Sequence, residues 1–152
     1  MTDHVIVTEE DNARINTMPR PDKKNALTQD MYIAMADAIK SAQSDPDIRS
    51  IVISGGSGVF TAGNDLEDFA KANTSNSDSD RPMAATQFLH ALAYNEKPLI
   101  GAVDGIAVGV GTTMLFHCDY VLASTTATFS TPFIHLGLVP ESAKQVIDLA
   151  DL

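Results

Sequence analysis

The sequence predicts an α/β fold, because stretches rich in β-branched residues alternate with stretches whose apolar residues recur at helical spacing. The chain has 152 residues, the length of one domain, so residues 1–152 are treated as a single unit. Hydrophobic residues make up 44% and charged residues 20%, which is the balance of an ordinary globular protein. These observations together favour a sheet that is flanked by helices.

The first third of the chain supplies three predicted strands and one long helix. HVIVTEE (4–10) and ARINTM (13–18) read as short strands, and IRSIVISG (48–55) reads as a buried strand rich in β-branched residues. Between them, Thr28 is a candidate N-cap for a helix over residues 29–42. The expected apolar face of this helix consists of Leu27, Met31, Met35, Ala38, Ile39 and Ala42.

The rest of the chain continues the alternation. We expect a glycine-rich loop (55–65), a short helix (65–72), a polar and mobile stretch (73–82), a helix (83–95) and a buried strand (99–105). A second glycine cluster then leads into an apolar helix. Two strands (118–124 and 127–132), a turn-rich loop (133–141) and an amphipathic helix (142–152) complete the chain.

Charge and composition exclude several classes of function. The net charge is −10 and no basic stripe is present, so nucleic acid is not expected as a partner. No apolar run reaches the roughly 18 residues of a membrane span, and no secretory signal is visible. Cys118 is the single cysteine, which favours a reducing, cytoplasmic location. Neither His90 nor His117 has metal-ligand spacing with Cys118, so no metal is expected.

Two strand-to-helix transitions are candidates for an anion-binding site. IVISGGSGVFTAGNDL and LIGAVDGIAVGVGTT each end a buried strand in small residues before a helix begins. A helix N-terminus has free N–H groups, so two converging termini can hold one oxyanion between two amides. The alternative is that both glycine clusters are plain turns. The local basic cluster RPDKK, with Lys23 and Lys24, is either an anion site or a solvated loop.

From about residue 5 to residue 141 the chain resembles the crotonase superfamily, the enoyl-CoA hydratase/isomerase family. The resemblance rests on four pieces in register: RPDKKNALTQDM, IRSIVISGGSGVFTAGNDLEDF, KPLIGAVDGIAVGVGTTMLFHCDYVLAS and ATFSTPFIHLGLVPE. It implies a crotonase-like (ClpP/crotonase) spiral core of ββα units. It further implies an acyl-CoA ligand, no separate cofactor because coenzyme A is part of the substrate, and a homotrimer or a dimer of trimers.

The resemblance also assigns roles to residues. The backbone amides of Asn64 and Val110 would bind the thioester oxygen. The family often has glycine where this chain has Val110, and valine still supplies an N–H group. The other implied substrate-binding residues are Ala62, Gly63, Asp65, Leu66, Gly109, Lys23 and Lys24.

The expected catalytic residue is Glu141. Hydratases of the family use two glutamates, and this chain has Thr113 and Phe133 at those two positions. Glu141 ends the TPFIHLGLVPE loop, where the Δ3,Δ2-enoyl-CoA isomerases of the family place their one glutamate. The alternative is a structural role for Glu141, as a charge at the start of a helix that complements the helix dipole.

Three functions therefore stay open. An isomerase of fatty acid metabolism is favoured over a hydratase or another crotonase-type enzyme, and over a non-catalytic CoA-binding or assembly subunit. Family members carry a further C-terminal helical region after the LGLVPE loop. The sequence stops soon after this loop, so we expect a missing or shortened C-terminal region.

Overall fold

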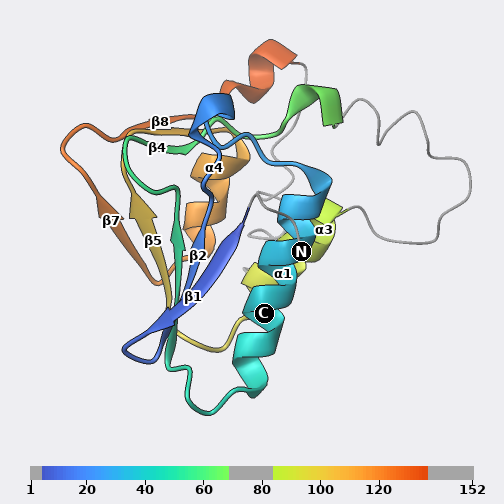
Figure 1. Ribbon diagram of the computed structural model, residues 1–152. Helices are drawn as coiled ribbons and strands as arrows, with labels where there is room; N and C mark the ends of the chain where they lie inside the picture. The colour runs from blue at the N-terminus through green and yellow to red at the C-terminus, as the bar shows by residue number, and fades with distance from the viewer. Residues whose placement is uncertain (1–4, 69–83, 137–152) are drawn as a thin grey trace, which may run out of the picture.

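The computed structural model describes residues 5–68 and 84–136, which form two sheets and the helices around them (Figure 1). The larger sheet has five strands in the order β1-β2-β3-β5-β7, and the smaller sheet has three in the order β4-β6-β8. The mixed α/β architecture predicted from the sequence is confirmed. Three predictions lie outside the described residues: the polar stretch 73–82, the terminal helix 142–152 and the position of Glu141.

Strands β1 (Ile6–Glu10) and β2 (Ala13–Thr17) form an antiparallel hairpin, as their sequence predicts. Asp11 and Asn12 make the turn at φ of 48° and 63°, in the left-handed region that Asn and Asp tolerate better than most residues. All five residues of β1 are exposed, whereas β2 buries alternate residues. β1 therefore forms an exposed edge of the larger sheet, and β2 contributes its alternate buried residues to the core.

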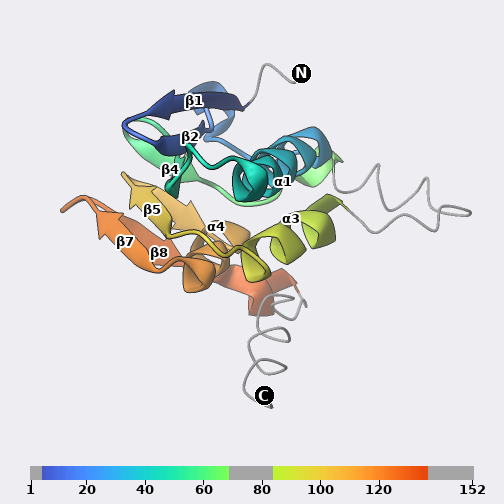
Figure 2. The same ribbon diagram turned by 90° about the horizontal axis from the view of Figure 1, so that it is seen from below.

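Helix α1 (Gln29–Ser44) begins where the sequence predicts, because the Thr28 side chain accepts a hydrogen bond from the Met31 amide. It runs two residues beyond the predicted end. Its apolar face is buried and packs beside α3 (Ala84–Ala93), as both ribbon views show (Figure 2). The rings of Tyr32 and Phe88 link the two helices at a centroid distance of 5.6 Å.

Strands β3 (Ser50–Ser54), β5 (Leu99–Val103) and β7 (Tyr120–Ala123) extend the larger sheet in parallel. Each is followed by a three-residue strand of the smaller sheet: β4 (Val59–Thr61), β6 (Ile106–Val108) and β8 (Thr128–Ser130). Each pair then leads into helical residues, which are 66–68, α4 (Val110–Thr113) and the 3-10 helix η3 (Pro132–Leu136). This succession is the expected spiral of ββα units.

Two sequence predictions were wrong in detail. The segment 55–65 was expected to be a loop, but it contains β4, whose three residues are too few for a period to show in the sequence. The apolar helix expected after the second glycine cluster is only α4, and the chain continues as the 3-10 helix η2 (Met114–His117). This tighter segment lies against β5, since a Cβ on Gly101 would come within 2.6 Å of the Leu115 side chain.

Candidate active site

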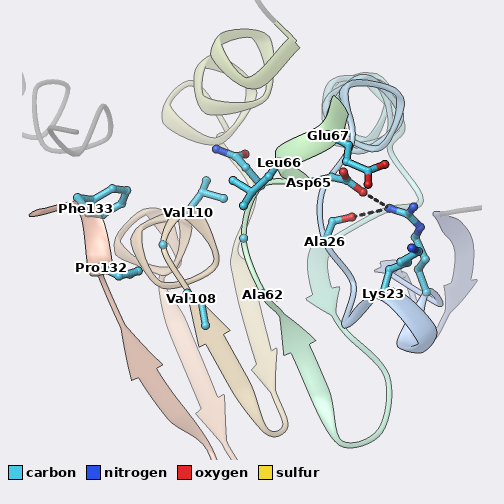
Figure 3. Close-up of a pocket in the computed structure, with 14 residues that line it drawn as sticks. Lys23, Ala26, Ala62, Asp65, Leu66, Glu67, Val108, Val110, Pro132 and Phe133 are labelled. Carbon is cyan, nitrogen blue, oxygen red and sulfur yellow. Dashed lines mark hydrogen bonds and ion pairs between the residues drawn. The ribbon is translucent and has the colours of Figure 1, made fainter. Parts of the chain in front are cut away.

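One cavity of the described chain lies where the ββα units meet the loop before α1. Its volume is about 630 Å³. Figure 3 shows its basic wall around Lys23 facing its apolar wall at Pro132 and Phe133. Its lining residues are Arg20, Lys23, Ala26, Ala62, Gly63, Asn64, Asp65, Leu66, Glu67, Val108, Gly109, Val110, Pro132 and Phe133.

The first amide, that of Asn64, is turned away from its neighbouring chain by an isolated parallel bridge to Leu27. The Leu27 N–H donates to the Gly63 carbonyl at 2.8 Å, and the Asp65 N–H donates to the Leu27 carbonyl at 2.9 Å. In a parallel ladder the residue between these two bonds points its own N–H and C=O to the opposite side. Within the described part of the chain, the Asn64 N–H has no hydrogen-bond acceptor.

Gly63 is what lets this loop come close to β6. It has a φ of +89°, and a Cβ at this position would lie 2.8 Å from the Val108 carbonyl oxygen. A larger residue would therefore have to move the loop that carries the Asn64 amide.

The second amide, that of Val110, opens helix α4. Gly109 turns the chain at a φ of +58°; its N–H donates to the Ser130 carbonyl at 2.8 Å, and its carbonyl accepts from Thr112 and Thr113. The Val110 N–H lies in the first turn of the helix, where no intrahelical acceptor exists. No acceptor is present for it among residues 5–68 and 84–136 either. Two unpaired amides thus belong to residues that line one cavity.

The basic wall is built around Arg20, whose role the sequence did not indicate beyond its place in the RPDKK cluster. Its guanidinium donates to the Asp65 carboxylate and to the Ala26 carbonyl, both at 3.0 Å. Burial alone would raise the pKa of Asp65, but the hydrogen bond from the Asp68 amide and the contact with Arg20 outweigh it, so the pKa lies below its usual range. Asp65 is therefore an ionised structural partner of Arg20.

The two lysines of the cluster differ. Lys23, at the end of the 3-10 helix η1 (Pro21–Lys23), lines the cavity. Lys24 is exposed and is not among the lining residues, although its backbone carbonyl accepts a hydrogen bond from Ala62 at 2.9 Å. The structure thus separates two residues that the sequence treats alike.

The positions that carry glutamate in hydratases are apolar or neutral. Thr113 is buried at the end of α4, and Phe133 lines the cavity. Among the described lining residues the only carboxylates are Asp65, which Arg20 neutralises, and Glu67, which is exposed. The predicted base, Glu141, lies outside the described residues.

The described chain contains no further feature that points to a metal or a membrane. No three His, Cys, Asp or Glu side chains come together as ligands within it. None of its helices combines the length and the apolar character that a membrane crossing requires.

Comparison with known proteins identifies the family. Residues 9–147 match the sequence model of the enoyl-CoA hydratase/isomerase family. The chain belongs to this family, within the crotonase superfamily. Rat enoyl-CoA delta isomerase 2 is 37% identical over 140 residues, which cover 91% of this chain and 36% of the rat protein. The 2,3-dehydroadipyl-CoA hydratase of Escherichia coli is 34% identical over 137 residues, covering 90% of this chain and 52% of that protein.

Solved structures of the family have the same fold. A putative enoyl-CoA hydratase/isomerase from Acinetobacter baumannii superposes with a TM-score of 0.88 at 36% identity, covering 95% of this chain and 59% of that one. The present chain thus spans between 36% and 59% of the lengths of these three relatives. Both isomerases and hydratases occur among these relatives, so membership of the family does not by itself distinguish the two reactions.

Proposed function

We propose that the protein binds an acyl-CoA thioester and isomerises 3-enoyl-CoA to 2-trans-enoyl-CoA. The observation that carries the proposal is a pair of backbone amides, those of Asn64 and Val110, which have no acceptor within residues 5–68 and 84–136 and whose residues line one cavity. Preorganised amides of this kind stabilise the negative charge that develops on a thioester oxygen. They need no side chain for the task, because the donors belong to the backbone.

The reaction needs one acid–base group, and Glu141 is our candidate. Its carboxylate takes a proton from C2 of the substrate, and the electrons of that C–H bond form a dienolate whose oxygen accepts from the two amides. The protonated Glu141 then returns the proton at C4, so that the double bond moves from C3–C4 to C2–C3. A carboxylic acid near an apolar wall, such as that of Phe133, has a raised pKa, which suits a group that both takes and gives a proton.

The two ends of the cavity fit the two parts of an acyl-CoA. Lys23 lies on one wall and can attract a CoA phosphate, while Pro132 and Phe133 offer apolar surface to an acyl chain on the other (Figure 3). Ala62 and Leu66 lie between them (Figure 3), and Gly63 and Gly109 also line the cavity. The overall charge of −10 opposes binding of an anion, so this local basic group matters more than it would in a neutral protein.

Hydration is the second candidate, because a relative that is 34% identical is a hydratase. Hydration needs one group to activate water and one to donate a proton. Thr113 and Phe133 cannot serve as carboxylate bases, which favours isomerisation. A third possibility, a CoA-binding subunit without catalysis, would need the cavity but not Glu141.

Turnover of 3-enoyl-CoA by purified protein, followed as formation of the conjugated thioester, tests the proposal. Glu141→Gln keeps the size of the side chain and removes the base, so kcat should fall by roughly 10²- to 10⁴-fold while CoA ester binding persists. Glu67→Gln, at the exposed carboxylate of the cavity, should leave turnover unchanged. Full turnover in Glu141→Gln would remove Glu141 as the base, and hydration without isomerisation by the wild type would favour the hydratase.

A further inference from the structure

The Asn64 side chain is tied to the protein core by a tyrosine. The Tyr32 hydroxyl donates to Asn64 Oδ1 at 2.5 Å, across 32 positions of sequence. The two ends of this bond differ sharply in surroundings: Tyr32 is 1% exposed, whereas Asn64 is an exposed residue at the cavity. The bond therefore connects a fixed part of the molecule to a surface loop.

Tyr32 is well placed to act as a fixed point. It lies in the first turn of α1, whose start is capped by Thr28. Its ring packs at 45° against Phe88 of α3, with 5.6 Å between the centroids. A side chain held between two packed helices has little freedom to follow movements of the loop.

Asn64 has one bond besides the backbone bridge that helps to hold its amide. Its own N–H and C=O make no ladder bonds, because the bridge to Leu27 uses the Gly63 carbonyl and the Asp65 N–H. The Gly63 carbonyl and the Asn64 N–H belong to the same planar peptide unit, so the bond from Leu27 fixes one edge of that plane. The side-chain bond from Tyr32 adds a constraint on the residue that carries this N–H, and so opposes rotation of the plane about that edge.

We propose that Tyr32 is a positioning residue, which fixes the direction of the Asn64 amide toward the thioester oxygen. This inference rests on the proposed function, in which that amide holds the oxyanion. A donor stabilises a developing charge only if it is aimed before the reaction starts, and a misplacement on the order of 0.5 Å already weakens a designed site. Leu27 and Tyr32 flank the start of α1, so one helix end sets both the backbone and the side chain of Asn64.

The test is Tyr32→Phe, which removes the hydroxyl and keeps the ring against Phe88. The probe is butyryl-CoA with ¹³C at the thioester carbonyl, which has no double bond to move. Infrared difference spectra report how strongly the bound carbonyl is polarised. We expect a shift to lower frequency in the wild type and a clearly smaller shift in Tyr32→Phe.

Kinetics of 3-enoyl-CoA isomerisation should agree with the spectra. Losing one hydrogen bond that aims the donor should lower kcat by roughly 5- to 10-fold, with the dissociation constant for butyryl-CoA changed by less than about twofold. Tyr94→Phe is the matched control, since Tyr94 is 78% exposed and lies at the far end of α3. It should match the wild type in every readout.

A second variant shows whether the effect passes through Asn64. Asn64→Ala keeps the backbone N–H but removes the acceptor, so adding Tyr32→Phe to it should change neither the spectrum nor kcat further. Asn64→Asp keeps an acceptor for Tyr32 and should retain most of the shift. A merely structural role of Tyr32 would lower kcat in the Asn64→Ala background as well, and that result overturns the proposal.

The outcomes separate this inference from the proposed function. An equal carbonyl shift in the wild type and Tyr32→Phe would overturn the role of Tyr32 and leave the oxyanion site intact. Bound butyryl-CoA without any shift in the wild type, or no binding at all, would overturn the oxyanion site and Tyr32 with it.

Discussion

Asn25 is the residue whose replacement should most damage the wall that carries Arg20 and Lys23. It is fully buried, and its Nδ2 lies 2.8 Å from the Gly55 carbonyl oxygen, 2.9 Å from that of Val59 and 3.1 Å from that of Phe60. Its Oδ1 accepts from the Arg20 amide at 2.7 Å. One side chain thus joins the loop before α1 to the end of β3 and to β4.

The cost of Asn25→Ala follows from these contacts. The two protons of Nδ2 serve three carbonyls, so with the bond from Arg20 about three hydrogen bonds are lost. At about 1 kcal/mol net for each, and more for carbonyls left buried without a donor, we expect a loss of about 3–5 kcal/mol in the free energy of unfolding.

Urea denaturation with linear extrapolation measures this loss, and Asn12→Ala is the matched control. Asn12 has a similar backbone, with φ of 63° against 52° for Asn25, but it is exposed and donates one hydrogen bond, to the Asp47 carbonyl. The strain of alanine at positive φ adds to the loss in both variants, so Asn25→Ala should lose about 2–4 kcal/mol more than Asn12→Ala. Equal losses in the two variants would refute the reasoning.

Three further predictions concern ligand, thiol and assembly. Lys23→Glu should weaken butyryl-CoA binding in titration calorimetry, more at low salt than at high salt, whereas Lys24→Glu should have a smaller effect; equal effects would argue against the lining in Figure 3. Burial, and then the charge of Asp119, raises the pKa of Cys118 to about 11. At pH 8 iodoacetamide should therefore react far more slowly with Cys118 than with glutathione, and the reaction should become faster as the pH rises. A fast reaction of Cys118 at pH 8 would contradict this. Exposed Tyr120, Leu122 and Phe129 favour self-association, as a trimer by family resemblance, and light scattering that shows a stable monomer at micromolar concentration would count against it.

The sequence predicted best those elements whose signals are local. Helix α1 has both a cap at Thr28 and a regular apolar face, so its start was found to the residue. Strands β4 and β6 have three residues each and exist because they pair with one another, which no local pattern reports. Helix α4 is short, and Leu115 in the following η2 packs against Gly101 of β5, a tertiary contact that no local pattern reports.

The site divides in the same way. The glycine segments indicated Asn64 and Val110 as candidate amides, since glycines that follow a strand can be recognised in the amino-acid sequence alone. The ion pair between Arg20 and Asp65 and the bond between Tyr32 and Asn64 join residues 45 and 32 positions apart. Such pairs depend on how the loops fold back, so residue identity alone did not single out Arg20 or Tyr32.

The most direct test of the central claim is a crystal structure of the protein with butyryl-CoA bound. We expect the thioester oxygen within about 2.7–3.1 Å of both the Asn64 and the Val110 backbone nitrogens, with the Glu141 carboxylate beside C2 of the acyl chain. A thioester oxygen that contacts neither amide, or a Glu141 carboxylate that points away from the acyl chain, would contradict the account.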